Sequence, residues 1–347
     1  MPTPETNTEF YNTGDKKHAD AILEEVRSLY ALYGQQKPMG ESMPDPRKPL
    51  FFLNRTFLGE NDLLIILNTK RCRYQCWFCQ LPAKSSKTPI QADDILEQFR
   101  YVVHELKHSL SIIDRITLSN EGSVLDSETL PRDALLAIAS YINEIRRVRT
   151  LILETRLEFV DPAFLKIINQ AAPRVKINIL TGFETKNERI RELILHKRES
   201  LTMFINGMDQ VAEAGADLTA YVLFKPEPSM SDEEAFAEAS SSIDYLVEAC
   251  RSRKISLTIR LNPMYLSMDS RWSELAQSSP TYKPPRLSDV LALAKSKYEK
   301  GIEMYVGLST EGLDDGAGTY RSREDYSANL LKQAILFNNR RILMELA

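Results

Sequence analysis

The sequence lacks long apolar runs. No stretch of about 18 apolar residues occurs among the 347 residues, and the opening stretch MPTPETNTEFYNTGDKKHAD has no apolar segment of the kind that a secretory signal carries. These absences argue against a membrane-spanning helix and against export. We therefore expect a cytoplasmic protein without a membrane partner, in a compartment where thiols stay reduced.

The chain also lacks an excess of basic charge. Its 44 lysines and arginines face 48 acidic residues, so the net charge is −4. A dedicated nucleic-acid-binding protein usually carries a basic excess, so this balance argues mildly against that class. No internal repeat or low-complexity segment is visible, and 43% hydrophobic residues suffice for a large core, in one α/β barrel or in two ordinary domains.

Apolar, β-rich runs alternate with amphipathic runs along most of the chain. The expected strands cover residues 62–69, 113–120, 148–155, 175–182, 217–224, 255–262 and 302–308. Helical patterns lie between them, at 91–108, 131–146, 161–171, 232–252 and 287–298 among others. This alternation predicts parallel βαβ units. A glycine-rich dinucleotide fingerprint is missing, which favours a partial or near-complete parallel (βα) barrel over an open doubly wound sheet.

Shorter segments flank the predicted barrel. A helix at about residues 16–33 and a proline-rich connector at 38–49 predict a helical extension over residues 1–60. The barrel is expected to span residues 61–310. A last helix, from about residue 325, is expected to pack on the barrel within a C-terminal segment of residues 311–347.

Three of the four cysteines lie in the stretch KRCRYQCWFCQLP, at Cys72, Cys76 and Cys79. This stretch follows the first predicted strand, at the end where barrel enzymes place their chemistry. No histidine or further cysteine is nearby, so a closed zinc site is poorly supported. A [4Fe–4S] cluster normally takes four thiolates, and three leave one iron open for a substrate or cofactor. The fourth cysteine, Cys250, lies alone on a long helix and is expected to be an ordinary packing residue.

The pattern C-x3-C-x2-C, with Phe78 just before the last cysteine, resembles the signature of the radical S-adenosylmethionine (radical SAM) superfamily. In that superfamily the open iron is chelated by the amino and carboxylate groups of SAM. The reduced cluster passes an electron to the sulfonium, and a 5′-deoxyadenosyl radical then takes hydrogen from the substrate. The resemblance implies a radical SAM enzyme with a [4Fe–4S] cluster, SAM, and an electron donor such as flavodoxin or ferredoxin.

Further segments narrow the resemblance. The stretches SNEGSVLD, LETRLEFV and LTGFETKNERIREL, after the second, third and fourth predicted strands, resemble the elongator-related branch of the superfamily. Within it, AYVLFKPEP, LNPMYL and YKPPRLSDVL are most similar to the family of the archaeosine-synthase radical SAM subunit. SNEGSVLD departs from the commoner Gly-Gly-Glu form. The resemblance covers roughly residues 50–300 and is specific for the SAM machinery rather than for the substrate.

The resemblance implies roles for individual residues. Cys72, Cys76 and Cys79 would ligate the cluster, and the backbone near Phe78 would meet the adenine. The other candidates for binding SAM are Asn120 and Glu121 for its amino group, Glu154 and Arg156 for its polar end or the substrate, and Glu184 for the ribose hydroxyls or methionine. The candidate catalytic residues are Arg156, Lys225 and Asn262, which follow three different predicted strands.

Several of these residues could instead have purely structural roles. Glu154 and Arg156 could form a structural ion pair, because they lie two apart on a strand. Glu184 could complement a helix dipole, and Asn262 could make a turn before Pro263. The basic residues near the cysteines, Lys70, Arg71, Arg73, Lys84 and Lys87, could be solvated surface or a docking patch for an acidic electron donor.

The substrate follows less directly from the sequence. The net charge and the missing RNA-binding module favour a small metabolite, for example one from a specialised biosynthetic pathway. A tRNA-modifying lyase acting on a 7-deazaguanine adduct is the runner-up. The motifs are also compatible with SAM cleavage to a 3-amino-3-carboxypropyl group and, from a different class of protein, with a non-catalytic electron-transfer iron–sulfur protein.

Overall fold

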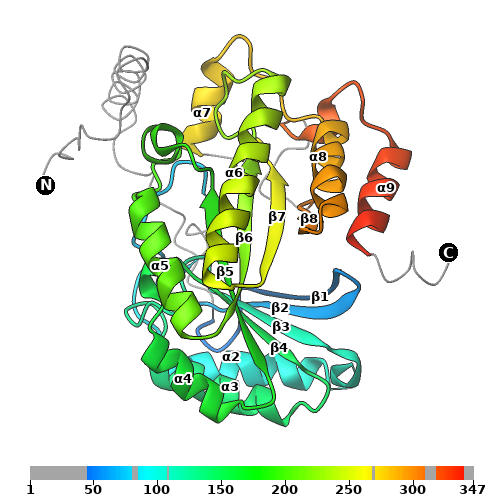
Figure 1. Ribbon diagram of the computed structural model, residues 1–347. Coiled ribbons are helices and arrows are strands. Elements are labelled where there is room, and N and C mark those ends of the chain that lie inside the picture. The colour runs from blue at the N-terminus through cyan, green and yellow to red at the C-terminus, as the bar shows by residue number, and fades with distance from the viewer. Residues whose placement is uncertain (1–44, 80–84, 108, 268–269, 309–317, 340–347) are drawn as a thin grey trace, which may run out of the picture.

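One eight-stranded sheet, curled into an open half-barrel, organises the chain (Figure 1). The computed structural model describes residues 45–79, 85–107, 109–267, 270–308 and 318–339. Strand order in the sheet follows chain order from β1 to β8. All neighbouring pairs are parallel except β1 and β2, which form an antiparallel hairpin. The predicted partial parallel barrel is therefore confirmed.

The strands match the apolar runs of the sequence. The seven expected strands correspond to β2 (Glu60–Ile66), β3 (Arg115–Ser119), β4 (Thr150–Glu154), β5 (Lys176–Glu184), β6 (Asp217–Phe224), β7 (Leu257–Pro263) and β8 (Glu303–Val306). Most of their residues are buried, because helices cover one face of the sheet and the barrel interior covers the other. Continuous apolar runs are the sequence signal of such strands.

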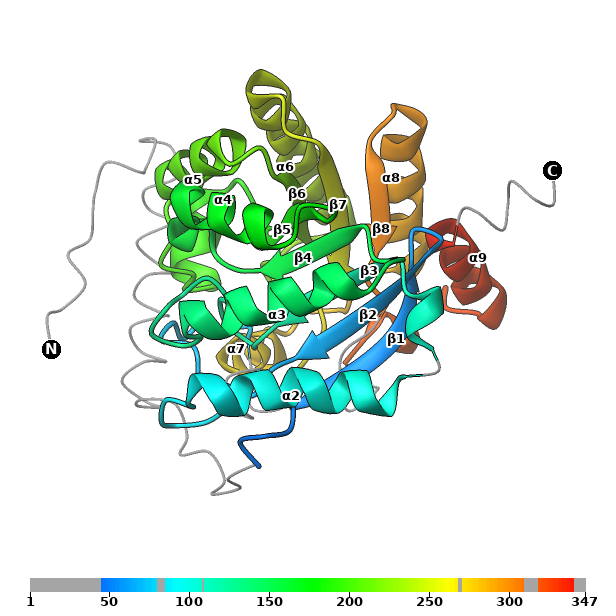
Figure 2. The ribbon, with the colours of Figure 1, turned by 90° about the horizontal axis from the view of Figure 1, so that it is seen from below.

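A ring of helices packs outside the sheet (Figures 1 and 2). Its members are α2 (Ala92–Glu105), α3 (Arg132–Glu144), α4 (Pro162–Ala171), α5 (Leu201–Glu213), α6 (Asp232–Arg253), α8 (Leu287–Glu299) and α9 (Ala328–Asn338). Each contacts the next one along this series. Asp161 caps α4 with Pro162 in its first turn, and α6 starts with a capping box of Ser231 and Glu234. Within the described residues, no helix is long and apolar enough to span a membrane.

Several elements differ from the sequence expectation. Strand β1 (Phe51–Phe57) was not expected, and it places part of residues 1–60 in the sheet rather than in an extension. The short helix α7 (Arg271–Ser278) was also missed. The helical stretch expected after β5 is divided into a π-helical turn (Ile190–Ile194) and α5. The helix expected at residues 16–33 lies outside the described residues.

A buried carboxylate anchors β1 at the amino-terminal end of the barrel. Asp62 is fully buried and accepts hydrogen bonds from Arg55 Nε at 2.8 Å and from Thr117 Oγ1 at 2.7 Å. Arg115 Nε lies 3.7 Å from the same carboxylate, and its guanidinium lies 4.4 Å from the ring centroid of Phe57. The carboxylate of Asp62 on β2 thus interacts with Arg55 on β1 and with Arg115 on β3, and so connects the three strands.

The last described helix covers the far edge of the sheet. The side-chain amide of Asn338, in α9, accepts from the N–H of Val306 and donates to its carbonyl, both at 2.8 Å. The amide thereby imitates a neighbouring strand, so that this part of the edge of β8 is not left open for pairing with another chain.

We expect Asp62→Asn to lower the free energy of unfolding by about 3–5 kcal/mol, because it keeps the shape but removes the buried charge that pairs with Arg55 and leaves Glu60, 3.6 Å away, as the remaining carboxylate partner of the buried Arg115. Asp217→Asn is the matched control: Asp217 pairs with the exposed Lys176 and should change stability by less than about 1 kcal/mol. Urea unfolding of both variants measures the difference. Equal, small effects would mean that Asp62 is not the anchor of β1.

Candidate active site

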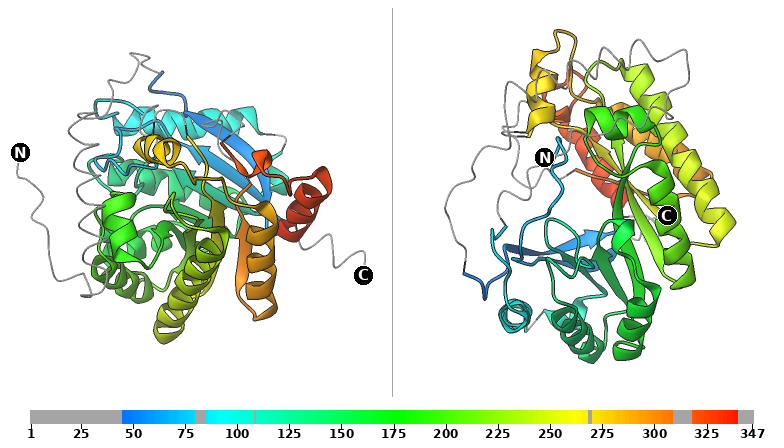
Figure 3. Two further views of the ribbon diagram at one scale, coloured as in Figure 1. Left: turned by 90° about the horizontal axis from the view of Figure 1, so that it is seen from above. Right: turned by 90° about the vertical axis from the view of Figure 1, so that its left-hand side faces the viewer.

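The cysteine loop begins just after β2, at the carboxyl ends of the parallel strands. Its three thiols are half-buried, at Cys72, Cys76 and Cys79. Between them, the buried Trp77 donates from its backbone N–H to the carbonyl of Leu195 at 2.8 Å and accepts at its carbonyl from Trp272 at 3.0 Å. The loop is thereby held between the segment after β5 and helix α7, which lies beyond the carboxyl ends of β6 and β7 (Figure 3).

An apolar cluster surrounds this junction. Its buried members come from segments far apart in the chain: Trp77, Ile190, Ile194, Leu195, Leu223, Met264, Trp272, Leu275 and Ala276. Trp272 is fully buried, and its indole N–H donates to the carbonyl of Pro226 at 2.7 Å. The cluster keeps water away from one side of the cysteine loop and lowers the local dielectric constant, which strengthens the electrostatic interactions there.

Burial raises the pKa of two thiols. The pKa of Cys76 rises to about 11 and that of Cys72 also lies above its ordinary value, because their thiolates are poorly solvated. Lys197 and Arg156 nearby act in the opposite direction. Both thiols are therefore protonated at neutral pH in the protein alone, and a metal centre that binds them displaces protons.

The donor set suits a polynuclear centre better than a single ion. Within the described part of the chain, no three His, Cys, Asp or Glu side chains are grouped so that they could hold one metal ion. A zinc ion needs such convergence, because all its ligands bind one atom. In an iron–sulfur cluster each thiolate binds a different iron, so three thiols spread over one loop fit it. Soft sulfur ligands are also those that such clusters prefer.

The segment after β3 lies against the cysteine loop. A Cβ atom at Gly122 would stand 3.2 Å from the Cβ of Cys72, so a larger residue would push the two segments apart. The buried Asn120 donates to Thr129 Oγ1 at 3.2 Å and to the carbonyl of Ser123 at 3.3 Å. Its amide oxygen is buried and has no hydrogen-bond partner among the described residues.

Two buried glutamates stand at strand ends in left-handed backbone conformations, Glu121 with φ 55° and Glu184 with φ 68°. Glu121 accepts from Ser85 Oγ at 3.0 Å. Glu184 lies 3.6 Å from Lys197 Nζ, and burial raises its pKa while Lys197 opposes that rise. A Cβ at Gly182 would stand 2.0 Å from a carboxylate oxygen of Glu184, so glycine there leaves room for the side chain.

Arg156 connects three parts of the site. Its guanidinium lies 3.8 Å from the ring centroid of Tyr74 in the cysteine loop. It donates to Glu158 at 3.0 Å and to the backbone carbonyls of residues 197 and 198 at 2.9 and 3.0 Å. Burial disfavours its charge, yet Glu199 and Glu158 keep its pKa above the ordinary value. Arg156 is therefore held by the protein itself.

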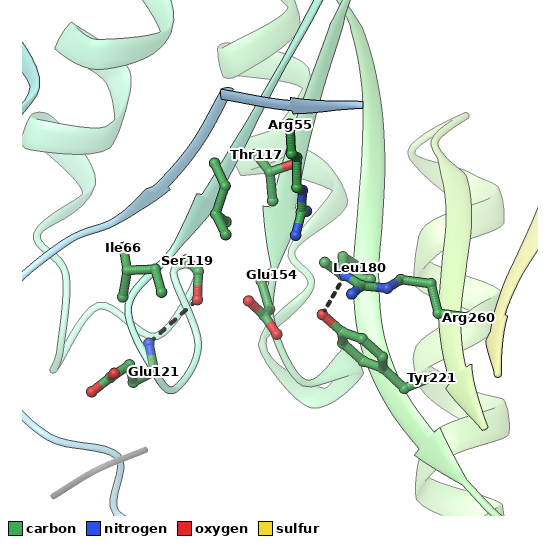
Figure 4. A pocket seen from close by; sticks show the side chains of 10 residues that line it. Arg55, Ile66, Thr117, Ser119, Glu121, Glu154, Leu180, Tyr221 and Arg260 are labelled. Carbon is green, nitrogen blue, oxygen red and sulfur yellow. Dashed lines mark hydrogen bonds between the residues drawn. The ribbon is translucent and has the colours of Figure 1, made fainter. Parts of the chain in front are cut away.

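A polar hollow opens into the barrel (Figure 4). It comprises about 340 Å³ of space not filled by protein atoms, part of it open to solvent. Inward-facing residues from β1 to β7 and the end of β3 line it: Arg55, Leu64, Ile66, Thr117, Ser119, Glu121, Glu154, Leu180, Tyr221 and Arg260. Glu154 belongs to this wall, and the structure shows no ion pair between it and Arg156.

Lys225 and Asn262 stand at the ends of β6 and β7. The ammonium of Lys225 lies 2.9 Å from Asp232, which also pairs with Arg323 at 2.8 Å. The amide oxygen of Asn262 faces Gly307, where a Cβ would stand 2.0 Å from it. Lys225 thus takes part in an ion-pair network at the start of α6, and catalytic roles for both residues stay predictions.

The sequence interpretation missed several residues of the site: Arg55, Lys197, Glu199, Tyr221, Arg260 and Trp272. Lys197 and Glu199 lie in the run HKRE just after the π-helical turn. Both are buried, but a run of charged residues normally indicates an exposed segment, so nothing in the sequence indicated their burial. Arg55 and Arg260 face inward on strands with mixed polarity. A charged residue between apolar positions of a strand was the only signal available for them.

The family comparison agrees with this geometry. A family model described as the radical SAM superfamily matches residues 66–239, half of the chain. The chain belongs to the radical SAM superfamily. It is therefore an enzyme that uses a [4Fe–4S] cluster and S-adenosylmethionine. Its cysteine spacing fits the C-x3-C-x2-C pattern of the superfamily.

Individual radical SAM relatives are distant. An uncharacterised protein of Methanocaldococcus jannaschii is 25% identical over 307 residues, which cover 87% of this chain and 80% of the relative. The archaeosine synthase subunit beta of Thermococcus kodakarensis is 23% identical over 244 residues, covering 68% and 72%. A solved spore photoproduct lyase variant is 15% identical, with a TM-score of 0.51 over 82% of this chain and 93% of that one, a likeness in fold.

The loop after β5 gives a pH prediction. Burial, together with Arg198 and Arg271, lowers the pKa of His196 to about 4, and its ring lies tilted against that of Trp77, with the centroids 5.4 Å apart. Between pH 6.5 and 4 the unfolded chain takes up a proton that the native state does not, so the free energy of unfolding falls by up to about 3 kcal/mol. We expect His196→Gln to lose stability less steeply in this window.

Denaturant unfolding at pH 7.5, 6, 5 and 4 measures this slope for both proteins. Glu184, whose raised pKa works in the opposite direction, is present in both and cancels in the comparison. Parallel slopes in the two proteins would contradict the assignment to His196.

Proposed function

We propose that Cys72, Cys76 and Cys79 hold the cluster of this radical SAM enzyme, and that its substrate is a small polar metabolite bound in the barrel. One observation carries the proposal: a clamped three-thiol loop faces the mouth of a barrel whose interior contains a polar hollow. The donor set, sulfur from one loop with no fourth ligand, fits a cluster that keeps one iron for the cosubstrate.

The cluster and S-adenosylmethionine supply reductive cleavage of the sulfonium and hydrogen abstraction from the substrate. The residues of the chain bind S-adenosylmethionine and the substrate and orient them relative to the cluster. The unpartnered amide oxygen of Asn120 and the carboxylate of Glu121 accept hydrogen bonds from the methionine amino group. Glu184 accepts from ribose hydroxyls, and the backbone at Phe78 meets the adenine. Arg156 acts as a positioning residue that holds the cysteine loop.

The charge at the mouth supports a small substrate. Arg73, beside the cysteines, pairs with Asp126 at 2.7 Å and with Glu128 at 3.2 Å. Arg71 donates to the carbonyl of Ser85. The charge of Arg73 is thus neutralised by carboxylates of the chain itself, which weakens the field that would attract a polyphosphate backbone. Lys84, from the same group, lies outside the described residues.

A second candidate is a tRNA-modifying enzyme. It is favoured by the similarity to two archaeosine synthase beta subunits, at 23% and 22% identity. In this case the hollow would take a single modified base while the nucleic acid stayed outside the barrel. Transfer of a 3-amino-3-carboxypropyl group and a purely electron-transferring role have no supporting observation of their own.

Cysteine replacement tests the cluster assignment. Each of Cys72→Ala, Cys76→Ala and Cys79→Ala should abolish the [4Fe–4S] absorption and the iron content after anaerobic reconstitution. Cys250→Ala should keep both, because Cys250 is buried in the hydrophobic core. If a variant that lacks one of the three thiols still holds a full cluster, that thiol is not a ligand of the cluster. Mass spectrometry of the SAM products of the wild type identifies which C–S bond breaks.

A gel-shift series against bulk tRNA, from 25 to 300 mM salt, tests the substrate class. We expect no binding tighter than the micromolar range at the lowest salt. Sub-micromolar binding that weakens steeply with salt would show several phosphate contacts and would replace the metabolite proposal by the tRNA one.

A further inference from the structure

The backbone turn that carries Glu184 is strained. The N–H of Thr185 donates to the carbonyl of Phe183 at 2.9 Å, so Glu184 is the central residue of a three-residue γ-turn, and its φ is 68°. A γ-turn with a positive φ is rare, and it is strained for a residue other than glycine. Strain of this kind persists only where the surroundings enforce it, and it gathers at functional sites. The groups that enforce this turn therefore bear on the role of Glu184.

The guanidinium of Arg191 bonds both carbonyls of the turn. Arg191 lies in the π-helical turn after β5 and is fully buried. Its Nη1 donates to the carbonyls of Phe183 and Thr185, the two residues that flank Glu184, with the second bond at 3.0 Å. In a regular strand these carbonyls would lie about 6.6 Å apart, too far for one nitrogen. Nη1 reaches both because the chain bends at Glu184.

The other end of the guanidinium is held by Glu199. Arg191 Nε and Nη2 donate to the carbonyl of Glu199 at 3.1 and 2.9 Å, and Nη2 donates to its carboxylate at 3.0 Å. These bonds and those to the turn use all five N–H donors of the arginine. The Glu199 carboxylate also lies 3.5 Å from Lys197 Nζ, which lies 3.6 Å from the carboxylate of Glu184. Arg191 can therefore act on a ligand only through the groups that it holds.

Helix α6 provides a second attachment for the turn. The N–H of Lys186 donates to Ser242 Oγ at 2.9 Å, and this hydroxyl donates to Glu238 at 2.7 Å. The hydroxyl of Thr185 donates to the same carboxylate. Thr185 and Ser242 are both fully buried. The two residues that follow Glu184 are thus tied to a long helix of the barrel, which limits the movement of the turn.

We propose that Arg191 is a positioning residue for S-adenosylmethionine: it locks the strained turn and so fixes the direction of the Glu184 carboxylate, and Ser242 supports the same turn from α6. The inference rests on the proposed function, because that function assigns Glu184 to the ribose hydroxyls of S-adenosylmethionine. A carboxylate that is already fixed binds the ligand more tightly than a mobile one, since its ordering costs no free energy at the moment of binding.

A double-mutant cycle tests the proposal. Arg191→Lys, Glu184→Gln and the double variant are reconstituted anaerobically, and their affinity for S-adenosylmethionine is measured by equilibrium dialysis with the cluster oxidised, so that the ligand is not cleaved. We expect Arg191→Lys to keep its iron content and to bind the ligand about tenfold more weakly, because the single nitrogen of a lysine cannot bond Glu199 and both carbonyls of the turn as the guanidinium does. In the Glu184→Gln background the same substitution should add less than about a twofold loss, because the carboxylate that it positions is already gone.

Ser242→Ala is the second variant, and it carries the same cycle with Glu184→Gln if Arg191→Lys does not fold. It removes the acceptor for the Lys186 N–H and leaves the buried charges intact, so we expect about a threefold loss of affinity that disappears in the Glu184→Gln background. Two matched controls should bind S-adenosylmethionine as the wild type does. Arg251→Lys makes the same change at an exposed arginine of α6, and Ser241→Ala makes it one residue before Ser242.

Losses that add in the double variants overturn the proposal, because Arg191 and Ser242 would then act on stability or on another contact rather than through Glu184. Wild-type affinity in Arg191→Lys overturns it as well. Glu184→Gln alone judges the proposed function: wild-type affinity in that variant means that Glu184 is not a ligand of S-adenosylmethionine, and the turn then has no part in binding it. The cysteine variants judge the ligands of the cluster separately, by iron content.

Discussion

The buried guanidinium of Arg156 joins the cysteine loop to the loop after β5, two segments that lie far apart in the chain. It does so with a cation–π contact to Tyr74 and with hydrogen bonds to two consecutive carbonyls. A charge withdrawn from water costs several kcal/mol unless it is paired, and here Glu158 and Glu199 supply the pairing. The position of the three thiols relative to the strand ends depends on this arrangement, because the loop itself contains no regular secondary structure.

Backbone strain gathers at the same end of the barrel. Among the described residues at this end, five that are not glycine hold left-handed conformations: Glu121, Glu184, His196, Arg198 and Lys225. Such conformations cost free energy and persist only where the surroundings enforce them. The bulge between Gly182 and Glu184 is an example, since it turns the Glu184 carboxylate toward Lys197 within space that glycine leaves open. The folded barrel stabilises these residues, and their side chains acquire fixed directions toward the mouth.

The sequence predicts the parts of this enzyme that are encoded locally. Continuous apolar runs predicted the seven strands from β2 to β8, and the cysteine spacing predicted the superfamily, because both signals lie within a few residues. Strand β1 escaped prediction because FFLNRTF alternates apolar and polar residues only in part, and its inward Arg55 depends on Asp62 for burial. Lys197 escaped for a related reason: its partners Glu184 and Glu199 come together only across a π-helical turn and two left-handed residues. Contacts made by folding leave little trace in local composition.

Charge is distributed differently at the mouth and in the interior of the barrel. At the mouth, Arg156, Lys197 and Lys225 all have carboxylate partners within the chain, and Arg73 does as well. These cations stabilise the fold and weaken the attraction of the mouth for polyanions. In the interior, the Glu154 carboxylate has no partner among the described residues and faces a polar hollow. The cations at the mouth thus have carboxylate partners within the chain, whereas Glu154, at the end of β4, has none among the described residues.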